Sequence, residues 1–226
     1  MVNTVGSLKV INKHWQKKWI KIKNSLYLTT KQKSVIVGSI LGDGTLQIGK
    51  RGVNANLKIE NGLAQKEYVL WKYNILKPWV FTKPKISYRY KESKEKYPKS
   101  LWFRTIRHPL LTQFHRKFYK NNKKIIPKDM EKYINRLVLA VWIMDDGSLN
   151  KNKIDISTYS FTKKEINLLL YALNKKFGLC ANYYRDRDKG YRIYFRVKET
   201  KNLIKIIKPY IINSMRYKIT LRPRND

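Results

Sequence analysis

Two apolar segments in different halves of the chain both end on Asp-Gly, and this repeat limits the folds open to the chain. The first segment spans residues 36–44 (IVGSILGDG), and the second spans residues 139–147 (LAVWIMDDG). A carboxylate at a helix C-terminus faces the negative end of the helix dipole, which disfavours it by about 0.3–1 kcal/mol. If both segments are helices, we therefore expect a compensating positive group, most simply a metal ion, beside Asp43 and Asp146.

The positive charge of the chain indicates the class of its partner. The chain has 50 Lys and Arg residues against 15 Asp and Glu residues, a formal net charge of +35. A compact protein with this charge repels itself, and binding to phosphates releases counterions. We therefore expect DNA or RNA as the partner, with a basic scaffold protein of the ribosomal type as the alternative. The basic residues are dispersed and no apolar stretch is long enough to cross a membrane, so we expect no membrane partner.

The other compositional signals concern redox chemistry and location. Cys180 is the only cysteine, which excludes an intramolecular disulfide and a cysteine-based zinc site. Residues 1–28 contain Lys but no acidic residue, and we interpret them as a basic arm that contacts phosphates. A cleavable targeting segment is the weaker alternative, because such segments are rich in Arg. The abundance of Lys, Ile, Asn and Tyr is typical of an AT-rich genome, so we expect an organelle, the mitochondrion before the chloroplast.

The first half of the chain has a readable order of elements. Thr29 and Gln32 form a capping box that opens the first motif helix, and residues 46–54 read as a linker. The elements that follow are a strand at 56–60, a helix at 65–76, strands at 86–90 and 101–106 around a loop at 91–99, and a helix at 109–119.

The second half repeats this order. Its capping box is formed by Thr162 and Glu165, and Gly178 ends the helix that it opens. The predicted elements are a motif helix at 128–145, a strand at 153–158, a helix at 162–177, strands at 183–185 and 191–197, and a helix at 200–207. We therefore predict an α/β (α+β) fold with a basic arm at 1–28 and two pseudo-symmetric halves at 29–126 and 127–226, each ordered α-β-α-β-β-α.

The duplication predicts that the motif helices pack side by side on a pseudo-two-fold axis. Gly38 and Gly42 are four residues apart, so they lie on one helix face and allow a close approach. This packing brings Asp43 and Asp146 together, and two carboxylates about 4 Å apart repel by on the order of 4 kcal/mol at an effective dielectric constant of 20. Divalent cations remove that repulsion. The free carbonyl oxygens of Gly42 and Asp145 would add hard ligands suited to Mg²⁺, with Mn²⁺ as a substitute.

Two lysines occupy equivalent positions downstream of the two motifs. Lys124 and Lys218 could position a water molecule or stabilise negative charge in a transition state. The simpler alternatives are that each Asp-Gly is a turn and that each lysine is a solvated surface residue. Their repetition in a strongly basic chain favours the functional interpretation.

The predicted strands also carry cations that could contact nucleic acid. A two-stranded ribbon fits the major groove, where Arg and Lys read base edges or hold phosphates. The candidates on or beside the strands are Lys58, Lys85, Arg89, Arg104, Arg107, Arg185, Arg187, Arg192 and Arg196.

Residues 36–44 and 139–147 resemble the two LAGLIDADG motifs of monomeric homing endonucleases, and segments 121–127, 160–162 and 208–218 are similar to other parts of that family. The resemblance covers residues 30–219. It implies two saddle-shaped antiparallel sheets with the motif helices between them. It also implies a monomeric, Mg²⁺-dependent endonuclease that breaks both strands of a long asymmetric DNA site. We expect its gene to lie in an intron, with a free-standing gene as the alternative.

The resemblance also implies roles for individual residues. Asp43 and Asp146 correspond to metal-binding catalytic aspartates, and Lys124 and Lys218 to paired active-site lysines. Glu60 and Ser157 fall near positions that often carry an amide. An RNA-binding member without cleavage activity, such as an intron maturase or a ribosome-associated protein, is the alternative. The retention of both aspartates favours the endonuclease.

Overall fold

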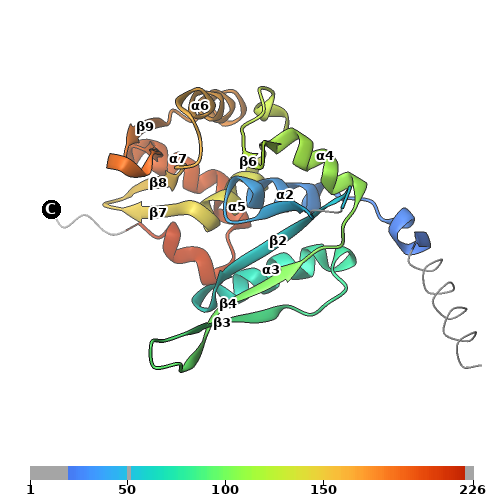
Figure 1. Cartoon of the computed structure of the whole chain (residues 1–226). Coiled ribbons are helices and arrows are strands. Elements are labelled where there is room, and N and C mark those ends of the chain that lie inside the picture. Colours follow the sequence, from blue (N-terminus) through green and yellow to red (C-terminus); the bar gives the residue numbers. More distant parts are fainter. Residues whose placement is uncertain (1–19, 50–51, 222–226) are drawn as a thin grey trace, which may run out of the picture.

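The structure is a computed structural model in which residues 20–49 and 52–221 are described. Of the predicted basic arm, residues 1–19 lie outside the described part of the chain, and residues 20–25 are helical. The described chain contains two four-stranded antiparallel sheets, a two-stranded ribbon and the helices that pack against them (Figure 1). No described helix is both long enough and apolar enough to cross a membrane.

The first half contains one of the four-stranded sheets, with strand order β1-β2-β4-β3. Its elements are α2 (Thr30–Leu41), β1 (Thr45–Ile48), β2 (Ala55–Gly62), α3 (Lys66–Leu76), β3 (Lys85–Tyr90), β4 (Lys96–Arg104) and α4 (Pro109–Phe118). The short ribbon β5 (Tyr119–Lys120) and β6 (Lys123–Lys124) follows. Asn121 and Asn122 form its turn with φ of 50° and 60°, which Asn tolerates better than most residues.

The second half repeats this topology with strand order β7-β8-β10-β9. Its elements are α5 (Arg136–Asp146), β7 (Gly147–Asn150), β8 (Lys153–Ser157), α6 (Lys163–Phe177), β9 (Asn182–Arg185), β10 (Tyr191–Phe195) and α7 (Val197–Ile207). The duplicated fold predicted from the sequence is confirmed, and each half is ordered α-β-β-α-β-β-α.

The predicted order missed one strand in each half. Residues 46–54, expected to be a linker, begin with most of β1, which pairs antiparallel with β2. β7 pairs with β8 in the same way. β1 reads Thr-Leu-Gln-Ile, which alternates only over the minimum length of four residues, and β7 reads Gly-Ser-Leu-Asn, with a single apolar residue. Both strands are held by pairing with a longer neighbour.

Two predicted boundaries were also wrong. The second motif helix begins at Arg136 rather than at residue 128, because the Asn135 side chain accepts a hydrogen bond from Val138 N at 3.0 Å and ends the preceding irregular segment. β4 begins at Lys96, inside the predicted loop 91–99, although its first residues are polar and include Pro98. Both capping boxes are confirmed, and Gly178 ends α6 in the left-handed conformation with φ of 64°.

The two motif helices form the centre of the molecule. α2 packs directly on α5, and most residues of both helices are buried on every side (Figure 1). The close approach depends on Gly38, because a methyl group there would lie 2.6 Å from Val141 Cβ and 2.8 Å from the Val138 carbonyl oxygen. α3 and α4 contact the first sheet, and α6 and α7 contact the second. Each sheet therefore has a helix-covered face and a face that no described helix covers.

We expect Gly38→Ala to lower the free energy of unfolding by about 1–3 kcal/mol, because the added methyl group overpacks the α2–α5 contact. Gly62→Ala is the matched control, since nothing lies within 4 Å of its added methyl group. Urea unfolding followed by circular dichroism measures both. Equal stability of the two variants would contradict the close packing at Gly38.

Candidate functional site

Asp43 and Asp146 lie at the adjoining C-terminal ends of α2 and α5. The two helices run in the same direction: Asn135 at the start of α5 donates a hydrogen bond to Ser34 Oγ in the first turns of α2, at 2.8 Å. At the other end, Asp43 N donates to the Asp145 carboxylate at 3.3 Å. The predicted convergence of the two Asp-Gly endings is therefore present in the structure.

Three carboxylates in this small volume repel one another. Burial, reinforced by the charges of Asp43 and Asp145, raises the pKa of Asp146 from its usual 3.8 to about 7. Burial also raises the pKa of the fully enclosed Asp145 carboxyl. The environment thus disfavours uncompensated negative charge, as expected of a site that gains a cation.

Lys124 and Lys218 reach the same place from β6 and from the 3₁₀ helix Asn213–Lys218. The Lys124 ammonium donates to the Gly42 carbonyl oxygen at 2.5 Å, and the Lys218 ammonium donates to the Asp145 carbonyl oxygen at 2.8 Å. Both lysines therefore satisfy carbonyl groups at the ends of the motif helices, where a positive charge is favoured. Burial lowers the pKa of both ammonium groups, and the three aspartates oppose that shift.

These contacts bear on the metal site predicted from the sequence. The carbonyl oxygens of Gly42 and Asp145, expected to be free for a metal, each accept a hydrogen bond from a lysine ammonium. A second cation beside either carbonyl would be repelled by that ammonium. The side chains of Asp43 and Asp146 are therefore the better ligand candidates.

A buried ion pair between Lys72 and Asp145 lies beside Asp43 and Asp146, and it was not predicted from the sequence. The Lys72 ammonium lies 2.7 Å from the Asp145 carboxylate, and both side chains are fully buried. The ammonium also lies 4.2 Å from the centre of the Tyr68 ring, and the Tyr68 hydroxyl donates to the Val141 carbonyl oxygen. A signal existed in the sequence: Lys72 lies on the apolar stripe of α3, in helical register with Tyr68 and Leu76.

Asp145 and Gly42 occupy equivalent positions in the two motifs, and the space between the helices holds a side chain from only one of them. A methyl group at Gly42 would lie 2.6 Å from Asp145 Oδ2 and would clash with Asp145 Cβ. Gly42 thus makes room for the Asp145 side chain, which crosses the interface to accept a hydrogen bond from the backbone of Asp43. The pseudo-symmetry is therefore broken at this pair of positions.

The amide group of the site comes from Asn61. Its Nδ2 donates to Asp43 Oδ2 at 2.7 Å, and its Oδ1 is buried without a hydrogen-bond partner among the described residues. The neighbouring Glu60 instead pairs with Lys58 and accepts from Ser100. Ser157 accepts from Arg192 at 3.0 Å on the second sheet. The amide that contacts Asp43 thus comes from the residue next to Glu60, a position that the sequence did not single out.

The donor set suits a hard divalent cation that is completed by other oxygen atoms. Within the described part of the chain, no group of three or more His, Cys, Asp and Glu side chains is arranged to hold a metal by itself. The available donors are the carboxylates of Asp43 and Asp146 and the unpaired Asn61 oxygen, all of them oxygens. Mg²⁺ is often held by one or two carboxylates together with phosphate oxygens and water, so the residues present fit that ion.

Three of the predicted DNA-contacting cations share the uncovered face of the first sheet. Lys58 on β2 lies opposite Arg104 on β4, and Lys85 on β3 lies opposite Trp102 on the same face. Arg89 is exposed beyond a bulge in β3. Arg107 follows β4, and its guanidinium group packs against Gly49 in the loop between β1 and β2.

The cations of the second half are more scattered. Arg192 lies on the uncovered face opposite Ser157, and its guanidinium also donates to Ser148 and to Tyr159. Arg185 pairs with Tyr191 and therefore belongs to the opposite side of the sheet. Arg187 lies in the turn between β9 and β10, and Arg196 lies just before α7, both exposed.

Comparison with known proteins gives consistent matches. Residues 33–203 match the model of the LAGLIDADG DNA endonuclease family. The chain is 31% identical to DNA endonuclease I-ChuI of Chlamydomonas applanata, over 85% of this chain and 96% of that protein. It is 28% identical to cytochrome b mRNA maturase bI2 of Debaryomyces hansenii, over 95% and 83%. The solved structure of homing endonuclease I-WcaI bound to its DNA recognition sequence superposes with a TM-score of 0.82, at 27% identity, over 90% of this chain and 92% of that one.

We expect Lys72→Met to lower the free energy of unfolding by about 3–5 kcal/mol, because it leaves the Asp145 carboxylate buried without a partner. The double variant Lys72→Met/Asp145→Asn removes both charges and should recover part of that loss. Urea unfolding at pH 8 measures both. If the loss of unfolding free energy in the double variant equals or exceeds the sum of the losses in Lys72→Met and Asp145→Asn, a direct ion pair is contradicted.

Asp146→Asn should change how stability depends on pH. The folded state holds a proton on Asp146 up to pH about 7, whereas the unfolded chain releases it near 4, so this group destabilises the metal-free fold as pH rises between those values. We expect the variant to be about 2–4 kcal/mol more stable than the parent at pH 8 in a chelator and equally stable near pH 4. A pH-independent difference in unfolding free energy would contradict the raised pKa.

Proposed function

Because the chain belongs to the LAGLIDADG DNA endonuclease family, we propose that it is a site-specific homing endonuclease that breaks both strands of a long, asymmetric DNA site. The observation that carries the proposal is the retention of Asp43 and Asp146 at adjoining helix ends in one buried, electrostatically strained cluster. The similarity to named endonucleases over nearly the whole chain supports it.

Asp43 and Asp146 are the proposed metal-binding residues of this enzyme, with Mg²⁺ as the ion and Mn²⁺ as a substitute. When bound, the ion would supply a water of lowered pKa and a counter-charge for the leaving oxygen of a phosphodiester. Asn61 orients the Asp43 carboxylate through its amide hydrogen bond. Lys72 orients it indirectly, by holding Asp145 against the Asp43 backbone.

Lys124 and Lys218 are the proposed catalytic lysines. Their carbonyl contacts fix each ammonium group at the edge of the aspartate cluster. From there the two charges can stabilise the additional negative charge on phosphate as the bond breaks. The lowered pKa of each ammonium makes its proton easier to transfer than that of a solvated lysine.

The uncovered sheet faces are the proposed DNA-binding surface. Lys58, Lys85, Arg104 and Arg192 stand on those faces, where they can read base edges or hold phosphates. Arg89, Arg107, Arg187 and Arg196 lie on adjoining loops and strand ends and suit backbone contacts. Arg185 lies on the other side of its sheet, so we assign it a peripheral phosphate contact.

The chain supplies both halves of the site, so a monomer is the proposed active form, with halves near residues 29–126 and 127–226. The composition supports expression from an organelle, and we favour the mitochondrion. The second candidate function is RNA binding as an intron maturase. It is favoured by the relatives named cytochrome b mRNA maturases, one of which matches 95% of this chain.

We expect the purified chain with Mg²⁺ to linearise a plasmid that carries the intronless form of its own insertion site. Asp43→Asn and Asp146→Asn should each slow cleavage of both strands by about 10²-fold or more, and Lys124→Met and Lys218→Met by about 10- to 100-fold. Agarose gels under single-turnover conditions measure the rates.

Asp129→Asn is the matched control, because Asp129 pairs with Lys117 away from the site. It should cleave at the parental rate. If the parent chain does not cut in Mg²⁺ or Mn²⁺ but binds its folded intron RNA tightly, the endonuclease proposal fails and the maturase function is supported.

A further inference from the structure

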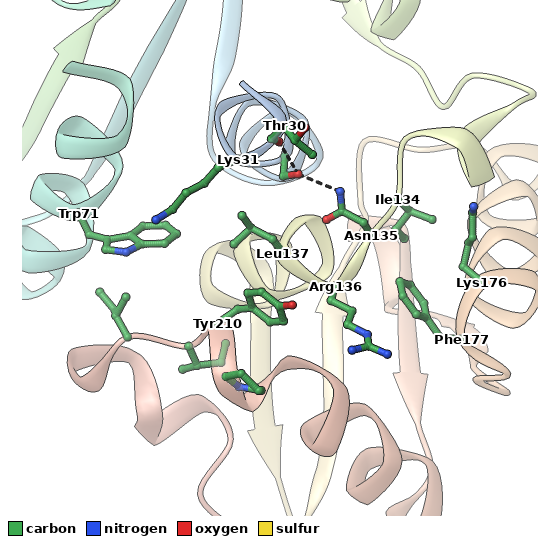
Figure 2. A pocket seen from close by; sticks show the side chains of 14 residues that line it. Thr30, Lys31, Trp71, Ile134, Asn135, Arg136, Leu137, Lys176, Phe177 and Tyr210 are labelled. Atoms are coloured by element: carbon green, nitrogen blue, oxygen red, sulfur yellow. Dashed lines mark hydrogen bonds between the residues drawn. The ribbon is translucent and has the colours of Figure 1, made fainter. Parts of the chain in front are cut away.

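A groove crosses the N-terminal ends of α2 and α5, at the opposite end of both helices from the aspartates. It consists of two adjoining cavities, of about 810 and 560 Å³, that share Thr30, Ser34 and Asn135 as lining residues. We call it the N-end groove, and Figure 2 shows its larger cavity. The helices have 12 and 11 residues, so the groove lies on the order of 16–18 Å from the aspartate cluster.

Aromatic side chains from both halves of the chain line the N-end groove; Trp71 and Phe177 are half-buried against the core, and Tyr210 is exposed. Trp71 on α3 and Phe177 on α6 lie on opposite sides of the larger cavity, and Tyr210 lies between them near Leu137 (Figure 2). Trp71 is supported from behind by the stacked ring of Tyr68 at 5.8 Å. Tyr27, which is 76% exposed, lines the smaller cavity. Such surfaces can stack with nucleobases of any sequence.

The charge of the groove is entirely positive. Lys31, Arg136 and Lys176 line the larger cavity, and Lys33 and Lys132 line the smaller one. In the described structure none of these five forms an ion pair, and no acidic residue is among those that line either cavity. Figure 2 shows Lys31 extending towards Trp71, and Arg136 between Tyr210 and Phe177. Cations therefore alternate with aromatic rings along the groove.

This arrangement fits a polyanion whose bases are unstacked. A DNA duplex keeps its bases paired and stacked inside, so it could use the charges but not the rings. Loops and bulges of folded RNA present splayed bases that stack on aromatic side chains while the backbone contacts cations. The groove is also separated from the aspartate cluster by the length of two buried helices, so both ligands can be bound at once.

We propose that the N-end groove binds a single-stranded segment of RNA, with bases against Trp71 and Tyr210 and phosphates against Lys31, Arg136 and Lys176. The groove is a second nucleic-acid site, and its assignment does not rest on the DNA cleavage proposed above. A chain that has lost cleavage could keep this site, and a chain that cuts DNA could lack it.

Fluorescence anisotropy tests the proposal with the full chain and a labelled RNA of about 12 uridines. Saturating unlabelled duplex of the insertion site occupies the sheet faces throughout. Tyr210→Leu and Trp71→Leu should each weaken RNA binding about tenfold. The triple variant Lys31→Gln/Arg136→Gln/Lys176→Gln should reduce the slope of log affinity against log salt by about 2, or about 0.7 for each lost phosphate contact. Duplex affinity should not change.

The matched controls are Tyr171→Leu and the triple variant Lys163→Gln/Lys164→Gln/Lys201→Gln, all on exposed positions of α6 and α7 outside the groove. They should retain parental RNA affinity. Tyr210→Leu and the charge variants keep the test valid if Trp71→Leu fails to fold. Displacement of the RNA by duplex, equal losses in the control variants, or equal affinity for single-stranded DNA of matching length would overturn the proposal.

Discussion

Like-charge repulsion at the adjoining ends of α2 and α5 is the constraint around which the rest of the structure is arranged. The interface between these helices is tight because Gly38 permits backbone contact, and that packing forces Asp43, Asp145 and Asp146 into one volume. Lys72 forms an ion pair with Asp145, and Lys124 and Lys218 donate hydrogen bonds to the carbonyl oxygens of Gly42 and Asp145. Burial first, and the charges of Asp43 and Asp145 second, still raise the pKa of Asp146 to about 7. A divalent cation and a phosphate backbone would complete this arrangement.

The site is asymmetric although the fold is duplicated. At equivalent motif positions, one half has Gly42 and the other has Asp145, because only one side chain fits between the helices. Asp145 then binds the backbone of the opposite half and recruits the buried Lys72. Among the described residues, an amide donates to the motif aspartate in the first half alone, from Asn61 to Asp43. The two halves therefore hold equivalent aspartates by different means, which suits an asymmetric DNA target.

Features that depend on residues close in the sequence were predicted correctly, whereas features that depend on a partner distant in the sequence were missed. The capping boxes at Thr29 and Thr162 depend on residues three positions apart, and both were predicted correctly. The meeting of Asp43 with Asp146 followed from the repeat alone. β1 and β7 exist only through pairing with longer strands, and Lys72 is buried only because Asp145 meets it from the other half. No local pattern in a lysine-rich chain separates such a lysine from a solvated one, except its place on the apolar stripe of α3.

The two ends of the motif helices thus face different chemistry: carboxylates at the C-terminal ends, and cations with aromatic rings at the N-terminal ends. The central claim is that Asp43 and Asp146 jointly hold the catalytic metal. Anomalous diffraction from crystals of the chain bound to its insertion-site duplex, grown with Mn²⁺, tests it most directly. We expect manganese in contact with both carboxylates and with a scissile phosphate, and none in crystals of Asp43→Asn/Asp146→Asn. Manganese bound elsewhere in a complex that cuts its DNA would contradict the account.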